Sequence, residues 1–249
     1  MKENSSEKSE WFEEWFNTPF YHILYKNRNE KEAELFVSNL INKLSVRKGA
    51  HILDLACGKG RHSVYLNKHG FNVTGADLSI NSIAEAKKHE NDTLRFVVHD
   101  MRESIPKLKV EYIFNLFTSF GYFDNQDDNL QVLKACHEML EEKGILVIDF
   151  LNLNKAIANL VPKEDKHIDG IDFHIEKKYD GKHIYKTISF GDLGQTYSYT
   201  ERVQGLTKSD FENLLRKAGY DITGYYGNFL LEEYDEASSD RLIIIARKK

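Results

Sequence analysis

Three acidic residues follow three successive apolar segments of the chain, and the first of them opens a glycine-rich loop. Asp54 is followed closely by Gly58 and Gly60, whereas Asp77 and Asp100 come after the next two apolar segments. A loop of glycines lets a ligand approach the backbone closely, because glycine has no side chain and tolerates positive φ. Open α/β sheets bind nucleotides where their parallel strands end. This spacing therefore predicts a site for a nucleotide-like cofactor.

The glycine loop nearly matches the dinucleotide fingerprint Gly-x-Gly-x-x-Gly, with Ser63 in the last position. One hypothesis is therefore an NAD(P)-dependent oxidoreductase in which Asp77 binds a ribose. Two acids argue against it, since Asp54 would repel a pyrophosphate and Asp100 has no role in that scheme. A cofactor that carries an ammonium and a sulfonium group would instead be attracted to these acids.

Apolar segments alternate with amphipathic helical patterns through the first 150 residues. Alternation of this kind predicts a parallel sheet with right-handed crossovers. The expected strands are His51–Leu55, Phe71–Ala76, Leu94–Val98, Tyr112–Phe117 and Ile145–Phe150, and the expected helices are Glu30–Leu44, Arg61–His69, Asn81–Glu90 and Asn125–Glu142.

The pattern changes after the fifth strand to polar and aromatic segments that are typical of antiparallel strands. Asp180-Gly181 is a strong two-residue hairpin signal. We therefore expect an antiparallel β insertion over about residues 154–205. Its expected strands are Asp172–Tyr179, Lys182–Phe190 and Gln195–Gln204, and a helix at Thr207–Ala218 with strands at Tyr220–Tyr226 and Leu242–Ala246 completes the chain.

The composition of the 249-residue chain suits one α/β domain with an insertion. A net charge of −5 does not favour a nucleic-acid partner. Cys57 and Cys136 lack metal-ligand spacing, as do the histidines, so we expect neither a disulfide nor a metal site. Residues 1–10 do not resemble a signal peptide, and no apolar run approaches the roughly 20 residues of a membrane span. We expect a cytoplasmic monomer or homodimer whose partner is a small molecule.

Taken in order, these motifs resemble those of class I S-adenosylmethionine-dependent methyltransferases. The family's glycine motif, Asp-x-Gly-x-Gly-x-Gly, stands here as Asp54-Leu55-Ala56-Cys57-Gly58-Lys59-Gly60, with Ala56 in place of the first glycine. The segments around Asp77, Asp100 and Phe117 resemble the ends of the family's next three strands. The resemblance covers roughly residues 20–153 and 206–249. It implies a Rossmann-like, seven-stranded, mostly parallel sheet with helices on both faces and its last strand antiparallel.

The same resemblance implies roles for individual residues of the cofactor site. Gly58 and Gly60 would admit the methionine part of the cofactor, and Asp54 would bind its ammonium. Asp77 would bind the ribose hydroxyls, although the acids are also suited to capping a helix or turn. The remaining candidates are Leu78, Asp100 and Met101 at the adenine, Tyr25 and Arg28 in an N-terminal helical lid at about residues 11–30, and Ala56 and Phe117 in the loops after two strands.

The resemblance further implies transfer of a methyl group from S-adenosylmethionine to an N or O atom of a small metabolite by in-line displacement. Such a reaction needs positioning and exclusion of water more than a general base. Residues 154–205 would form the roof of an acceptor pocket over a domain made of residues 1–153 and 206–249. The aromatic residues Phe190, Tyr197 and Tyr199 would either line that roof or pack on one another. The alternatives are the NAD(P)-dependent oxidoreductase and a non-catalytic S-adenosylmethionine-binding protein.

A catalytic base is not evident from the sequence. A base is needed only where the nucleophile arrives protonated. The candidates are His99, Tyr122, His183, Tyr199 and Tyr225.

Overall fold

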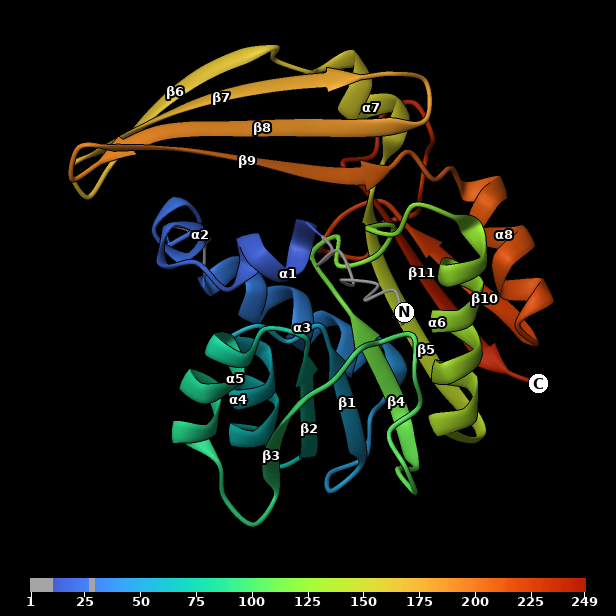
Figure 1. Cartoon of the computed structure of the whole chain (residues 1–249). Coiled ribbons are helices and arrows are strands. Elements are labelled where there is room, and N and C mark those ends of the chain that lie inside the picture. Colours follow the sequence, from blue (N-terminus) through green and yellow to red (C-terminus); the bar gives the residue numbers. More distant parts are fainter. Residues whose placement is uncertain (1–10, 27–29) are drawn as a thin grey trace, which may run out of the picture.

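The computed structural model describes residues 11–26 and 30–249, and within them seven strands form one twisted sheet. Its strand order is β10-β11-β5-β4-β1-β2-β3, and β11 runs antiparallel to both of its neighbours while the other pairs are parallel (Figure 1). The predicted α/β fold, with its last strand antiparallel, is confirmed. The strands of this sheet are β1 (His51–Leu55), β2 (Asn72–Asp77), β3 (Leu94–Val98), β4 (Val110–Asn115), β5 (Leu140–Leu151), β10 (Tyr220–Tyr226) and β11 (Arg241–Lys248).

Helices cover both faces of this sheet. No helix within the described residues is long and apolar enough to cross a membrane. The helices are α1 (Trp11–Phe16), α2 (Pro19–Leu24), α3 (Glu30–Leu44), α4 (Arg61–Lys68), α5 (Ile80–Ala86), the 3₁₀ turn η1 (Lys87–His89), α6 (Gln126–Met139), α7 (Leu153–Ala158) and α8 (Lys208–Lys217).

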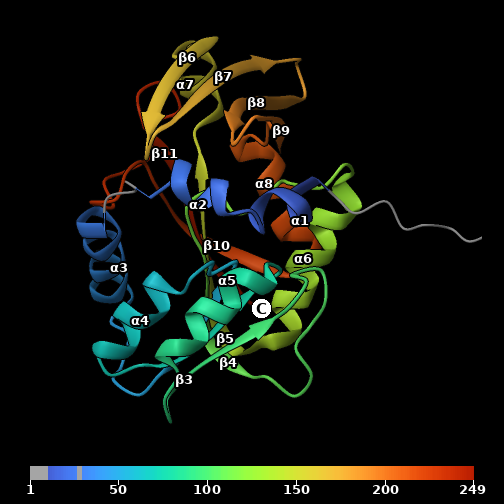
Figure 2. The ribbon, with the colours of Figure 1, turned by 60° about the vertical axis from the view of Figure 1, so that its left-hand side comes forward.

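Alternate residues of the central strands enter two separate hydrophobic cores. Ile52 packs with α3, α4 and α5, whereas Leu53 and Leu55 pack with α6 and α8. Figure 2 shows α3 and α4 on one side of the sheet and α6 on the other. Because successive side chains of a strand point to opposite faces, a strand covered on both sides must be apolar throughout. This requirement explains the continuous apolar segments of the sequence.

The antiparallel insertion after β5 contains four strands in the order β6-β7-β8-β9, one more than expected. The additional strand, β6, has the sequence Lys-Glu-Asp-Lys-His-Ile and lies at the edge of the sheet with mostly exposed or half-buried side chains. Such a strand lacks the alternation of apolar residues that identifies a half-buried strand. The six-residue helix α7 was not predicted either. The insertion strands are β6 (Lys163–Ile168), β7 (Ile171–Tyr179), β8 (His183–Asp192) and β9 (Gln195–Gln204).

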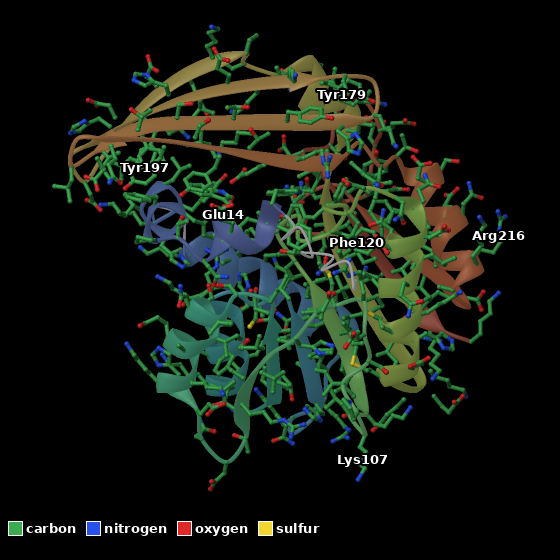
Figure 3. All side chains as sticks on the ribbon, viewed as in Figure 1. Glu14, Lys107, Phe120, Tyr179, Tyr197 and Arg216 are labelled. Carbon is green, nitrogen blue, oxygen red and sulfur yellow. The ribbon has the colours of Figure 1, made fainter. Side chains whose placement is uncertain are left out.

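The insertion lies across the carboxyl-terminal ends of the parallel strands, with α1 and α2 between the two sheets (Figure 1). One face of the insertion packs on these helices in a third hydrophobic cluster, which includes Trp15, Phe173 and Phe190. Figure 3 shows Tyr197 on the insertion above α2, whereas Lys107 lies at the opposite end of the larger sheet. The two N-terminal helices are therefore held between both sheets, at the end of the molecule where the predicted site lies.

Candidate cofactor and acceptor site

A cavity of about 350 Å³, here called the first cavity, lies at the carboxyl ends of β1, β2 and β3. Its wall includes the glycine loop, the strand-end acids, the loop after β4 and residues of α1 and α2. The topology thus brings together side chains that are distant in the sequence. The predicted site residues that line the first cavity are Tyr25, Asp54, Ala56, Gly58, Asp77, Leu78, His99, Asp100, Met101, Phe117 and Tyr122.

Asp54 and Asp77 lie in the first cavity as largely desolvated carboxylates. The Ser63 hydroxyl donates a hydrogen bond of 2.5 Å to Asp54, and the amides of Gly58 and Ser79 each donate one of 2.8 Å to Asp77. Burial raises the pKa of Asp54 to about 6, despite the bond from Ser63, and burial also raises the pKa of Asp77. A cation or hydroxyl group bound beside these acids would relieve the cost of their desolvation.

Asp100 has a different environment. Arg102 donates to both of its carboxylate oxygens through Nε, at 3.1 and 3.0 Å, and through Nη2 at 2.6 Å. Burial would raise the pKa of Asp100, but the hydrogen bonds and charge of Arg102 outweigh it and lower that pKa below its usual value. Asp100 therefore lines the first cavity as an ionised carboxylate that is already paired with Arg102.

The glycine loop has two residues with positive φ at the first cavity. Gly58 has a φ of 56°, and a Cβ atom built on it would meet no atom within 4 Å, so the space beside its backbone is open to a ligand. Ala56, in place of the family's first glycine, has a φ of 61°. Its methyl group fits, although the left-handed conformation costs a residue with a side chain roughly 1 kcal/mol.

Gly60 is a predicted site residue that does not line the first cavity. It precedes α4 with a φ of 80°, and a Cβ atom there would lie 2.5 Å from the Phe96 ring. The position requires glycine because the loop and the sheet approach each other closely, which differs from the ligand contact that we expected.

The Tyr25 hydroxyl bonds to the insertion. It donates to Glu201 on β9, at 2.6 and 2.7 Å from the two carboxylate oxygens, and it accepts from Lys186 on β8. Trp15 also donates its indole N–H to Glu201, at 2.8 Å. The ring of Tyr25 lines the first cavity while its hydroxyl connects α2 to the insertion. The second lid candidate, Arg28, lies outside the described residues.

Phe117 begins a sharp turn after β4, where it and Thr118 have φ values of 59° and 60°. Asp149 holds this turn, because its carboxylate accepts from the Phe117 amide at 2.7 Å and from Arg241 Nε at 2.8 Å. Arg241 Nη2 donates to the Thr118 hydroxyl at 2.8 Å. The Phe117 ring stacks on His62 with a centroid distance of 4.9 Å. Asp149 and Arg241 were not identified from the sequence.

A second cavity of about 340 Å³ lies beside the first and extends beneath the insertion. Five aromatic residues, here called the aromatic collar, line both cavities: Phe16, Tyr21, Tyr25, Phe117 and Tyr122. The other residues that line the second cavity are Glu32, Thr118, Glu201, Val203 and Arg241.

The candidate bases differ in their access to the two cavities. His99 and Tyr122 line the first cavity, and the Tyr122 hydroxyl donates to the Thr118 carbonyl at 2.7 Å. Tyr199 lines neither cavity and stacks on Trp15 with a centroid distance of 4.6 Å. Phe190 and Tyr197 stack on each other in the same cluster, so these aromatic residues pack against the lid instead of lining a roof. His183 and Tyr225 also lie outside both cavities.

His22 on α2 lines the first cavity and was not proposed as a site residue. Its Nε2 atom is buried and has no hydrogen-bond partner within the described ranges. Burial and the charge of Lys59 lower its pKa to about 4, so the ring is neutral at pH 7. Among the described residues, no group of three or more His, Cys, Asp and Glu side chains is arranged to hold a metal ion.

Comparison with known proteins identifies the family. A family profile described as "Methyltransferase domain" matches residues 46–219, which is more than half of the chain. The chain belongs to this methyltransferase family. It is therefore an S-adenosylmethionine-dependent methyltransferase of class I, and the hypothesis of an NAD(P)-dependent oxidoreductase is not supported.

Individual methyltransferases resemble this one over most of its length. It is 29% identical over 235 residues to the glycine/sarcosine/dimethylglycine N-methyltransferase of Actinopolyspora halophila, but the match spans 91% of this chain and only 40% of that protein. It is 28% identical to the glycine/sarcosine N-methyltransferase of Halorhodospira halochloris, over 91% of this chain and 84% of that one. The fold also matches a crystal structure of an S-adenosylmethionine-dependent methyltransferase from Clostridium acetobutylicum, with a TM-score of 0.78, 18% identity and coverage of 92% and 96%.

Proposed function

We propose that this methyltransferase transfers the methyl group to a nitrogen or oxygen atom of a small metabolite that binds in the second cavity. The observation that carries the proposal is the aromatic collar, which forms a wall common to the two cavities. A donor in one cavity and an acceptor in the other would meet at that wall. The insertion would act as the roof of the acceptor site, since Glu201 and Val203 of β9 line the second cavity.

The first cavity has the hydrogen-bond acceptors that S-adenosylmethionine requires. Asp54 presents a buried carboxylate to the ammonium, Asp77 presents one to the ribose hydroxyls, and the open space at Gly58 admits a ligand against the backbone. Leu78, Asp100 and Met101 also line the first cavity and would contact the adenine. The cofactor, when bound, supplies a methyl group on a positively charged sulfur.

The residues of this chain would promote transfer by position and by exclusion of water. The five aromatic residues of the collar line both cavities, and at the junction they would attract a cation and exclude water. Asp149 and Arg241 fix Phe117 in its turn, and Glu201 ties Trp15 and Tyr25 to the insertion. Of the candidate bases, Tyr122 lines both cavities and His99 lines the first, so Tyr122 would be the candidate beside an acceptor that must lose a proton.

The relatives support a small acceptor. Two of them are named for methylation of the nitrogen of glycine and its methylated derivatives, although this chain spans 40% of the first of these proteins. Other relatives include ubiquinone biosynthesis O-methyltransferases of Coxiella burnetii, so the names alone leave nitrogen and oxygen acceptors open.

Calorimetric titration with S-adenosylhomocysteine, and with NADH and NADPH in parallel, tests which cofactor the protein binds. We expect micromolar binding of S-adenosylhomocysteine alone. Transfer of tritium from methyl-labelled S-adenosylmethionine to a panel of small amines and alcohols then tests the acceptor class. Binding of the cofactor product without transfer to any small acceptor, but with transfer to protein or RNA, would refute the proposed function.

A further inference from the structure

We infer that the acceptor is an amine that carries a carboxylate, with Arg241 as the anchor of the carboxylate and the aromatic collar around the amine. This inference rests on the proposed function, because it places the acceptor in the second cavity. It selects nitrogen as the methylated atom, and it assigns Arg241 as a specificity-determining residue.

Arg241 provides a fixed cationic group on the side of the second cavity formed by the large sheet. Its Nε donates to Asp149 and its Nη2 to Thr118, each at 2.8 Å, and its side chain is 20% exposed. Within the described ranges, Nη1 has no hydrogen-bond partner, so part of the planar fork remains available. A guanidinium held by two such contacts loses little conformational freedom when it binds a carboxylate.

A single guanidinium favours a single negative charge on the ligand. Among the described residues that line the second cavity, Arg241 is the one basic side chain, and Asp149 already offsets part of its charge. Phosphate sites commonly add lysines or a nest of backbone amides to the guanidinium. The second cavity therefore matches a carboxylate better than a phosphate.

The other charged groups of the second cavity favour a cationic group. Glu201 lines the cavity on the insertion side, and Glu32 of α3 lines it as an exposed side chain. Lys186 offsets Glu201 in part, at 3.8 Å, but it does not itself line the cavity. The aromatic rings of the collar line the same cavity and can attract an ammonium. A ligand with opposite charges at its two ends is thus complementary to the guanidinium of the sheet and to the carboxylates and aromatic rings.

The chemistry of transfer agrees with this placement. The ammonium of the bound acceptor first releases a proton to solvent. The lone pair of the resulting neutral amine then forms the N–CH₃ bond while the C–S bond breaks and its electron pair returns to sulfur, which becomes a neutral thioether. The positive charge moves from sulfur to nitrogen, and the methylated nitrogen then releases a proton to solvent if it carries one. The aromatic collar faces a cation before and after this step, which favours an amine over a hydroxyl group as the acceptor.

Matched acceptors test the inference with the unaltered enzyme. The panel contains short α- and ω-amino acids, their carboxamides, which keep the amine but lack the negative charge, and the corresponding hydroxy acids. Initial rates from methyl-labelled S-adenosylmethionine give kcat/KM, and calorimetry gives the affinity of each compound for the enzyme saturated with S-adenosylhomocysteine. We expect at least one amino acid to exceed its carboxamide about tenfold or more in both measurements, the scale of a hydrogen bond to a charged group.

Substitution of the anchor tests the residue assignment. We expect Arg241→Lys and Arg241→Gln to reduce the preference for amino acid over carboxamide at least about fivefold, mainly through KM. The matched control is Arg247→Lys, an exposed position on the same strand. Since Asp149 is buried, Arg241→Gln/Asp149→Asn serves as a second variant if the single change to Gln unfolds the protein.

The outcomes separate this inference from the proposed function. The inference is overturned if the enzyme uses carboxamides or hydroxy acids as well as amino acids or better, or if it neither binds nor methylates any amino acid. In either case, methylation of another small molecule would leave the proposed function intact. If both Arg241 variants keep the full preference for amino acid over carboxamide, Arg241 does not bind the carboxylate of the acceptor. Absence of S-adenosylhomocysteine binding, or of transfer to every small acceptor, contradicts the proposed function itself.

Discussion

The two cavities of this protein meet at the same aromatic collar, but they are built in different ways. The first cavity takes its polar groups from the ends of adjacent parallel strands, where Asp54, Asp77 and Asp100 succeed one another at intervals of 23 residues. The second takes its charged groups from three distant segments, with Glu32 in α3, Glu201 in the insertion and Arg241 at the start of β11. The proposed cofactor site thus takes its acids from one edge of the sheet, whereas the proposed acceptor site takes its charged groups from elements packed around that edge.

The difference extends to electrostatics. Asp54 and Asp77 are desolvated acids whose pKa values are raised by burial, so they gain from a ligand that brings hydrogen-bond donors or positive charge. The charged groups of the second cavity already have partners within the protein, such as Asp149 with Arg241 and Lys186 with Glu201. We therefore expect substitutions in the first cavity to change cofactor affinity strongly, and those in the second to change acceptor use more modestly.

The largest effect is expected for Asp77→Ala. This change removes the proposed partner of the ribose and leaves the amides of Gly58 and Ser79 without their acceptor. The affinity for S-adenosylhomocysteine should fall by about 1–3 kcal/mol, the scale of leaving polar groups unpaired. Calorimetry measures the change, with Asp221→Ala at an exposed site of β10 as the control. An unchanged affinity would count against the assignment of Asp77.

The pH dependence of cofactor binding should identify Asp54. Its pKa is raised to about 6 by burial, and a bound ammonium favours the ionised carboxylate. Above pH 6 the carboxylate is ionised and the affinity should be constant. Below pH 6 binding must expel a proton, so the dissociation constant for S-adenosylhomocysteine should rise by up to about tenfold per pH unit.

The variant Asp54→Asn provides the comparison for this pH profile. It should bind more weakly at pH 8 and show a flatter dependence between pH 5 and 7. Asp77, whose pKa is also raised by burial, accounts for any slope that remains. An identical slope in the original protein and in Asp54→Asn would show that another group binds the proton.

In the second cavity, Glu201→Gln should have a smaller effect that is confined to the acceptor. The amide keeps the shape of the side chain but weakens the bonds from Trp15 and Tyr25 and removes a negative charge. We expect kcat/KM for the acceptor to fall about three- to tenfold, since charge-assisted hydrogen bonds are about twice as strong as neutral ones. Glu233→Gln, at an exposed position, is the control. If Glu201→Gln lowered cofactor affinity more than acceptor use, the assignment of the second cavity to the acceptor would be wrong.

The smallest effect is expected for Ala56→Gly, which restores the family's glycine at a φ of 61°. Relief of the left-handed conformation and the greater freedom of glycine in the unfolded chain oppose each other, so the gain in unfolding free energy should be about 0–1 kcal/mol. Urea unfolding measures it. Ala86→Gly, where φ is −59°, should instead destabilise the protein by about 1 kcal/mol or more.

Much of the larger sheet was predictable because each strand carries its own signal. Strands β1 and β3 lie where the apolar segments predicted them, and β2 is displaced by one residue. The edge strand β6 could not be predicted, since its charged side chains face solvent and only pairing with β7 makes it a strand. The stacking of Tyr199 on Trp15 depends likewise on where the insertion meets the N-terminal helices.

The sequence by itself determined the parallel sheet, the glycine loop and the acids of the first cavity. It did so because the carboxyl ends of adjacent parallel strands necessarily meet at one edge, so acids at successive strand ends become neighbours. The tertiary structure alone decided that Gly60 packs on Phe96, that Tyr25 bonds to Glu201, and that Arg241 lies in the second cavity. Those contacts join segments up to 176 residues apart, and no local periodicity specifies which side chains will meet when separate layers pack together.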